Sequence, residues 1–255
     1  MSAIIVEEQP HARLYYHLLA HLDLGRDAAN IHRPDFDSKE WTEHLRRAYQ
    51  ACPHRLLAQV LPLLVGDLDT LKKVLRRGMP PLNDATGRSL RYQLLTAIEL
   101  EEEAFFASEQ ARSPRRIEHL LPRLDTLRGH LWGTEPPHPL HLWDCPALLA
   151  DDFTHARTTR SQQGWVIALS LDAPDDEVLI QILHEDTHSI TDPAVRRRFE
   201  GITQDTRAGS AGLAMHRALE QAVVDAGQEL FEGHAPELLP AYQRWRKRFG
   251  MPKLP

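Results

Sequence analysis

Hydrophobic residues in the first half of the chain recur at spacings of three and four, which is the pattern of amphipathic helices. In residues 11–24, for example, Leu14, Leu18 and Leu22 follow this spacing beside Tyr15. Prolines, glycines and acidic residues interrupt the pattern where helices commonly begin and end. The pattern predicts helices at residues 11–24, 38–52, 53–66, 67–78, 89–111 and 113–132.

Capping residues place several of these predicted helix boundaries. Ser38 is expected to cap the second helix, because a serine side chain can accept a hydrogen bond from the first turn. Asp67 stands at the start of the fourth helix and Gly78 at its end. The helix before residue 132 is expected to open at Ser113 and Pro114.

The pattern changes after residue 132. Residues 133–149, GTEPPHPLHLWDCPALL, are rich in proline and are predicted to form a loop or a domain boundary. Residues 153–160 and 164–171 predict two short strands, and the sequence SQQG between them suits a hairpin turn. The second strand, GWVIALSL, is rich in β-branched and aromatic residues. Helical patterns follow at residues 177–191, 213–233 and 235–250, with a loop at 201–212.

These elements predict a mainly α protein with a small β-sheet, which is the α+β class. Residues 1–132 would form a helical domain of unknown role. Residues 133–255 would form a second unit, built from a strand and two helices, or the two parts would make one continuous domain. The first helix of the second unit is expected to end at Asp192 and Pro193.

Composition excludes several classes of protein. The chain has 255 residues with 42% hydrophobic residues, so it can bury a core without disulfides, and its two cysteines, Cys52 and Cys145, cannot build a cysteine-rich zinc module. A net charge of −6 argues against a nucleic-acid partner. No apolar run approaches the roughly 18 residues of a membrane span, and no signal peptide is recognised. We therefore expect a cytoplasmic protein.

The sequence HEDTH places His184, Glu185 and His188 at H-E-x-x-H spacing inside an apolar helical pattern. Histidines four residues apart lie one turn apart on the same face of a helix, so both imidazoles can bind one metal ion. Zinc suits neutral nitrogen ligands. Glu185 would hold a zinc-bound water and take its proton. The alternative is a histidine-rich helix that is merely packed in the core.

The order of strand GWVIALSL and helix EVLIQILHEDTHSIT resembles the zincin metallopeptidases over roughly residues 150 to 232. The resemblance implies a zinc ion that polarises the scissile carbonyl of a peptide or protein substrate, and a general base at Glu185. It also implies that the strand before the motif helix is a sheet edge that binds the substrate backbone. Residues 133–255 would then be a zincin-like metal-binding domain.

A catalytic zinc needs a third protein ligand. Thr191 and Ala194 stand where metzincins have glycine and histidine, so that subclass is excluded. The gluzincin-like pattern takes a glutamate from a later helix, and Glu220 fits because a carboxylate among apolar neighbours is costly to bury unpaired. Glu229 and Asp192 are weaker candidates for the same role.

Two further residues on the later helix have expected roles. His216 lies one turn before Glu220 and would support the site or stabilise an oxyanion, which makes it a second candidate catalytic residue beside Glu185. Asp225 would orient His184 or His188 through the other ring nitrogen.

Other residues support different readings of the function. His17 and His21, with Asp23 and Asp27 nearby, could hold a second metal or line the same cleft, but they are more simply read as the boundary between an apolar face and water. The carboxylates at 99–103, ELEEE, would contribute to an iron-dependent oxidase in a helical bundle. A third reading is an inactive metal-binding interaction protein. Because Glu185 is present, a zinc-dependent peptidase is the leading hypothesis.

Overall fold

The structure is a computed structural model that describes residues 3–25, 31–109, 117–150, 153–161, 164–202 and 209–248. It confirms the predicted class, since it is mainly α with a small sheet. The helices are α1 (Pro10–Ala20), α2 (Thr42–Ala51), α3 (Arg55–Val60), α4 (Leu68–Arg77), α5 (Ala85–Glu109), α6 (Leu121–Trp132), α7 (Asp175–Arg198), α8 (Ala211–His234) and α9 (Leu239–Arg248), with short 3-10 turns at Leu61–Leu64, Pro146–Leu148 and Pro236–Leu238.

The main sheet has the strand order β1-β2-β6-β5, where β1 (Ile4–Glu7), β2 (Leu140–Asp144) and β6 (Trp165–Leu169) are parallel. The last strand, β5 (Arg157–Arg160), is antiparallel to β6, which confirms the predicted pairing of these two strands, whereas residues 162–163 of the predicted turn lie outside the described residues. Since β6 is an inner strand, the expectation that GWVIALSL forms the sheet edge is wrong, and β5 is that edge. A second small sheet pairs β3 (Leu149–Ala150) with β4 (Phe153–Thr154).

The prediction that residues 133–149 form a loop is wrong for β2, which lies in the middle of the sheet. All five residues of this strand are buried, because helices cover both faces of the sheet. Its sequence therefore lacks the alternation of polar and apolar residues that marks a half-exposed strand. The prolines that precede β2 remain outside the strand.

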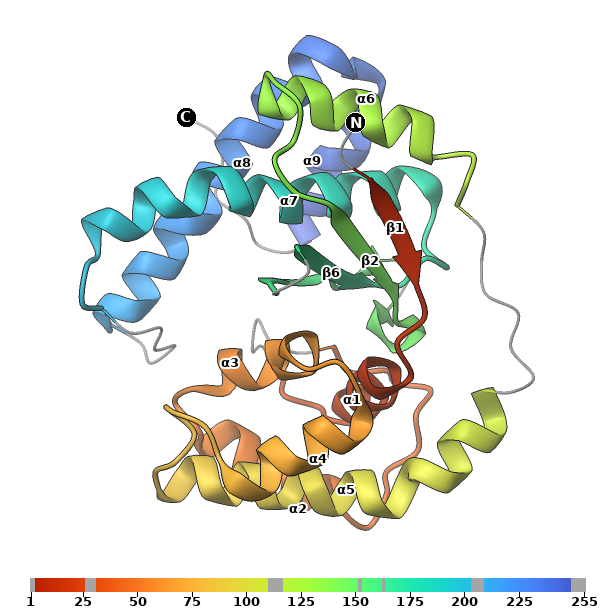
Figure 1. Cartoon of the computed structure of the whole chain (residues 1–255), viewed down its shortest axis with the longest axis vertical. Coiled ribbons are helices and arrows are strands. Elements are labelled where there is room, and N and C mark those ends of the chain that lie inside the picture. The colour runs from red at the N-terminus through yellow and green to blue at the C-terminus, as the bar shows by residue number, and fades with distance from the viewer. Residues whose placement is uncertain are drawn as a thin grey trace.

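Successive residues of the inner strands belong to two different hydrophobic cores. Trp143 and Val166 pack with the helices α1 to α5, whereas Leu142, Ile167 and Leu169 pack with α6, α7 and α9. Figure 1 shows these two groups of helices on opposite sides of the sheet. The sheet is thus the middle of three layers, and it sets the distance between the N-terminal helices and α7.

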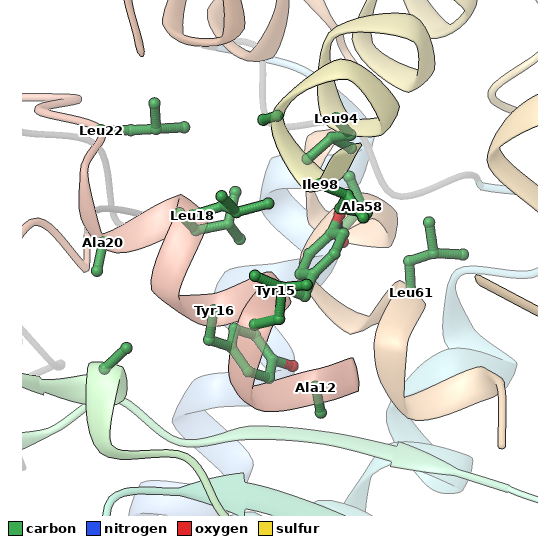
Figure 2. Close-up of a cluster of buried hydrophobic side chains, with 14 of the residues drawn as sticks. Ala12, Tyr15, Tyr16, Leu18, Ala20, Leu22, Ala58, Leu61, Leu94 and Ile98 are labelled. Carbon is green, nitrogen blue, oxygen red and sulfur yellow. Dashed lines mark hydrogen bonds between the residues drawn. The ribbon is translucent and has the colours of Figure 1, made fainter. Parts of the chain in front are cut away.

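The first core is held to α3 through two tyrosines of α1. The hydroxyl of Tyr15 donates to the carbonyl of Ala58 at 2.6 Å, and that of Tyr16 donates to the carbonyl of Gln59 at 2.9 Å. Figure 2 shows Tyr15 beside Ala58 and Ile98, so that α1, α3 and α5 meet around one ring. Both tyrosines are fully buried, and α3 therefore has a fixed position relative to α1.

Helix α7 is longer than predicted. It continues through Asp192 and Pro193 to Arg198, so the expected end at those two residues is wrong. A proline removes its own N–H, which costs one helical hydrogen bond, here to the carbonyl of Ser189. The packing of α7 along α8 stabilises the remaining turns. Acidic residues in the first turn and arginines in the last turn also favour this helix.

The predicted helix caps are confirmed at α4 but not at α2. Asp67 caps α4 by accepting from the N–H of Thr70 at 2.7 Å, and Gly78 ends that helix with a φ of 91°, as predicted. Ser38 does not cap α2, which begins after Trp41. The start of the helix predicted at Ser113 and Pro114 lies outside the described residues, within which α6 begins at Leu121.

The boundary predicted at residue 132 does not coincide with the division between the two cores. Strand β1 pairs with β2, and α6 packs against α7 and α8, although both elements precede that boundary. Separate folding of residues 1–132 and 133–255 stays a prediction. Within the described part of the chain, no helix has both the length and the apolar character to cross a bilayer.

Candidate metal centre

Helix α7 places the two motif histidines in the interior. His184 is 5% exposed and His188 is 9% exposed, and their rings lie 5.2 Å apart. The preceding turns of α7 are buried on all sides, because the sheet, α6, α8 and α9 surround them. Such burial explains why the helix is apolar around the motif, and it removes both imidazoles from bulk water.

Helix α8 brings Glu220 to the same point. Its carboxylate oxygens lie 3.4 Å from Nε2 of His184 and 3.7 Å from Nε2 of His188. A tetrahedral ion with bonds of 2.0–2.1 Å requires ligand atoms about 3.4 Å apart. The ligand atoms of these three residues lie within 4.8 Å of one another, and they form the single group of this kind among the described residues.

The Glu220 carboxylate has an unsatisfied acceptor that a metal would use. Its Oε2 atom is buried, and although Nε2 of His184 lies 3.4 Å away, this oxygen accepts no well-aligned hydrogen bond from the residues that the structure describes. Buried polar atoms without partners are rare in proteins and call for an explanation. Two imidazole nitrogens and one carboxylate oxygen are a donor set that suits zinc, so the residues present fit a divalent ion.

Asp192 supports the site from behind His188. Its Oδ1 atom lies 2.8 Å from Nδ1 of His188, and its other oxygen contacts Arg196 at 3.3 Å. When Nδ1 of His188 donates to Asp192, the lone pair of Nε2 is directed at Glu220 and is available to a metal. Asp192 therefore contacts the ring nitrogen of His188 opposite to Nε2, and it lies outside the group of three residues whose ligand atoms converge.

The charges of His188 and Glu220 influence each other. Burial lowers the pKa of His188, but the hydrogen bond to Asp192 and the charges of Glu220 and Glu185 outweigh it and raise the pKa to about 9. Burial would raise the pKa of Glu220, but the adjacent His184 and His188 lower it to about 2. At neutral pH an imidazolium and a carboxylate therefore face each other where the ion would bind.

We predict that zinc affinity rises about tenfold per pH unit between pH 6 and pH 8, because His188 must release its proton to bind the metal. The pKa of His188 is raised, so the proton competes with zinc at every pH below about 9. Competition titrations with a chromophoric chelator at each pH measure this slope. A zinc affinity that does not change with pH would contradict a His188 ligand that binds its proton this strongly.

Glu185 follows the first histidine and lines the cleft beside the three candidate ligands. Its backbone carbonyl accepts a hydrogen bond of 3.1 Å from the indole of Trp165 on β6, which fixes this turn of α7 to the sheet. Burial raises the pKa of Glu185 against the opposing effect of His188 and His184. A raised pKa moves a carboxylate toward the range in which it exchanges protons effectively at neutral pH.

A buried ion pair fixes the next residue of α7. Asp186 accepts a hydrogen bond of 2.8 Å from Nε of Arg128 on α6, and one of 3.2 Å from the indole of Trp132. Both members of the ion pair are completely buried. Breaking such a pair typically costs about 3–5 kcal/mol, because one charge remains buried without compensation. The pair therefore holds α7 in a defined rotation against α6.

The three candidate ligands lie in a cleft of about 1220 Å³. Residues of α3, of the edge strand β5, of α7 and of α8 line it, so both hydrophobic cores contribute to its walls. A volume of this size is ample for several residues of a peptide. His216 of α8 also lines the cleft, and its Nδ1 atom lies 3.9 Å from Glu220.

The structure does not bring two of the other predicted residues to the site. Asp225 is exposed and accepts a hydrogen bond from Gln221 at 2.6 Å, and it has no hydrogen bond or ion pair with His184 or His188. Asp192 has the position behind a histidine that was expected for Asp225. Glu229, the weaker alternative to Glu220, is exposed on α8.

The N-terminal histidines lie away from the cleft. His17 and His21 pack against aromatic rings that include Phe36, Trp41 and Phe105, so they lie in an aromatic cluster and do not line the cleft. Burial, together with His21, lowers the pKa of His17 to about 4. Asp27, predicted to lie near them, is outside the described residues.

Three carboxylates of the ELEEE segment on α5 contact residues of neighbouring elements. Glu99 pairs with Arg76 at 2.8 Å, Glu102 pairs with Lys72, and Glu101 accepts a hydrogen bond of 2.9 Å from the indole of Trp41. These contacts connect α5 to α4 and to the start of α2. The arrangement gives no support to a metal site at this segment.

Three cleft residues have no local sequence signal. Gln59 comes from α3, Arg157 is the first residue of β5, and His155 lies just before that strand. Burial and the charges of Arg157 and Arg248 lower the pKa of His155 to about 3, so this imidazole is neutral. Their spacing to the HEDTH motif is irregular, because the fold of the chain alone brings them to the cleft.

No protein-family model matches the chain, and neither a curated protein nor a solved structure shows a significant similarity to it.

Proposed function

We propose that the protein is a zinc-dependent hydrolase of the zincin type, gluzincin-like in its ligands, which cleaves peptides or proteins in the cytoplasm. The observation that carries this proposal is the convergence of His184, His188 and Glu220 beside Glu185 in one large cleft. Cys52 and Cys145 are buried and form no disulfide with each other, which agrees with a reducing compartment.

His184, His188 and Glu220 would hold the ion. A bound Zn²⁺ would supply Lewis-acid chemistry, which polarises a carbonyl and lowers the pKa of water. Asp192 would keep the Nε2 atom of His188 directed at the ion. The buried ion pair of Arg128 and Asp186 would hold the helix rigid during turnover.

Glu185 is the proposed general base. Its carboxylate would take a proton from the attacking water and pass it to the leaving amine nitrogen. The raised pKa of Glu185 supports the first step, because a more basic carboxylate takes up the proton of the water more readily. His216, at the wall of the cleft, is proposed to donate a hydrogen bond to the oxyanion.

The edge strand β5 is the proposed support for an extended substrate. It lines the cleft, and among the described residues it pairs with β6 alone, so its other side can accept a further strand. Main-chain hydrogen bonds to a peptide would place the scissile carbonyl beside the metal centre. The resemblance to zincins assigns this role to the strand before the motif helix, whereas here we assign it to β5.

Metal removal tests the proposed function. The protein, stripped with a chelator and returned to buffer with one equivalent of zinc, is assayed on a pool of internally quenched fluorescent peptides. We expect no cleavage without metal and recovery with zinc, since the unloaded ligands cannot polarise a carbonyl. Cleavage that persists in chelator would contradict the proposal. Oxygen consumption by an iron-loaded sample, with no peptide cleavage in either sample, would favour the oxidase.

A further inference from the structure

Two buried hydrogen-bond donors at the cleft lack acceptors. Gln59 on α3 is only 4% exposed, and its Nε2 atom makes no hydrogen bond with any part of the chain that the structure describes. Arg157 on β5 is half-buried, and its Nε atom is buried and has no such partner either. Both residues line the cleft. Unpaired buried donors destabilise a protein, so a ligand that supplies acceptors at this place would relieve that cost.

The two donors come from elements that are packed together. Helix α3 packs against β5, although they are separated by about a hundred residues of sequence. The backbone carbonyl of Gln59 accepts the hydroxyl of Tyr16, which Figure 2 places on α1. The guanidinium of Arg157 donates through one terminal nitrogen to the carbonyl of Ala156 at 2.7 Å. The backbone of Gln59 and one arm of Arg157 are thus fixed, while one donor of each remains unused.

The charges that line the cleft select for an anion. Arg157 forms no ion pair with the described residues, and its charge acts on Glu185, so it lies near the proposed base. The carboxylates that line the cleft are Glu185, Asp192 and Glu220, which all belong to the metal centre. The remaining charged residues of the lining are cationic, namely Arg157, Arg160, Arg196 and Arg217. The positive charge of these four arginines is opposite in sign to the net charge of the whole chain, which is −6.

We propose that Gln59 and Arg157 form a subsite that binds a carboxylate of the substrate, either an acidic side chain or the C-terminal carboxylate. The inference rests on the proposed function and adds a substrate class to it, namely acidic peptides. A carboxylate accepts hydrogen bonds from an amide and a guanidinium together, and it neutralises the guanidinium. A backbone carbonyl would satisfy the donors but leave the charge of Arg157 uncompensated. The helical N-terminal half would thereby take part in substrate recognition.

The test is a binding measurement on zinc-loaded Glu185→Gln protein, in which peptides bind without rapid cleavage. Dye-labelled hexapeptide pools carry either Glu or Gln at one fixed position, and each pool has a free or an amidated C-terminus. Fluorescence anisotropy gives the affinity for each pool. We expect at least tenfold tighter binding of either the Glu pools or the free-carboxylate pools, and the arm that shows this preference identifies the source of the carboxylate. In this background, Arg157→Met is expected to abolish the preference and Gln59→Leu to reduce it.

Matched controls separate recognition from folding. Arg197→Met removes an equal charge from an exposed position of α7 that does not line the cleft, and it should keep the preference. Gln59→Leu should leave the thermal midpoint unchanged or raise it, because it removes an unpaired buried donor. A structural role for Gln59 would instead lower that midpoint.

Several outcomes would overturn the subsite. The first is equal affinity for all four kinds of pool, that is, Glu or Gln with a free or an amidated C-terminus. The others are no binding of any pool, and a preference that survives Arg157→Met. Unchanged affinity in the Glu185→Gln background, together with lost turnover when Arg157→Met is made alone in the wild-type chain, would place this residue in the chemistry and also overturn the subsite. Zinc-dependent cleavage of neutral and acidic peptides alike would leave the proposed function standing alone. Binding of acidic peptides without any cleavage by the zinc-loaded wild type would support the subsite and contradict the proposed function.

Discussion

Glu185→Gln is expected to lower peptide hydrolysis by a factor of about 10²–10⁴ while zinc stays bound at its wild-type level. Glutamine has nearly the same shape as glutamate but cannot take up a proton at neutral pH. The candidate ligands are His184, His188 and Glu220, so the change removes the base and leaves the metal set intact. Initial rates on the quenched peptide pool, together with zinc content of the same samples, measure both effects.

The control for this variant is Glu229→Gln, which makes the same chemical change at an exposed position of α8. Its rate and zinc content should match those of the wild type. The proposed role of Glu185 would be lost if Glu185→Gln hydrolysed peptides at a rate close to wild type. Loss of zinc in Glu185→Gln would instead show that this carboxylate is itself a ligand.

Glu220→Ala is expected to lower zinc affinity by at least about 100-fold. Mutating a partner that only orients a ligand typically lowers metal affinity 10- to 100-fold, and a direct ligand should matter more. Asp192→Asn should therefore fall between Glu220→Ala and the wild type, since Asp192 contacts His188 and not the metal position. Chelator competition at a fixed pH gives the three affinities.

Glu229→Ala is the matched control, because it removes a carboxylate from the same helix at an exposed site. Its zinc affinity should equal that of the wild type. Circular dichroism of each metal-free variant checks that the fold is retained. If Asp192→Asn lowered zinc affinity more than Glu220→Ala, Asp192 would be the ligand and Glu220 the residue that supports it.

The sequence predicted the motif helix because its signal is local. His184 and His188 are one turn apart, and the apolar residues around them are by themselves enough to indicate burial. Glu220 was predicted from its apolar setting and from the resemblance to gluzincins, and the structure places it beside both histidines. Its role as a ligand remains a proposal.

The elements that the sequence did not predict are those whose pattern depends on the tertiary fold. Strand β2 is buried on both faces, so it shows no alternation, and prolines precede it. The helix α7 passes Pro193 because its packing against α8 outweighs the local signal for an end. Local rules weigh neighbours in sequence and omit such packing.

The cleft wall could not be predicted for a similar reason. Gln59 and Arg157 have no regular spacing to each other or to the motif, and they meet because α3 packs against β5. Asp192 follows His188 by four residues, which makes it a candidate ligand from the sequence alone. Its actual contact with Nδ1 depends on α7 continuing through Pro193, which the sequence did not indicate.

Elemental analysis of the purified wild type and Glu220→Ala, with zinc and iron measured together, tests the metal centre most directly. Both proteins are incubated with equal zinc and iron and then passed through a desalting column. We predict one zinc per wild-type chain, little iron, and less than a tenth of that zinc in Glu220→Ala. Equal zinc in both proteins, or a wild type that retains neither metal, would contradict a site built from two turns of α7 and one residue of α8.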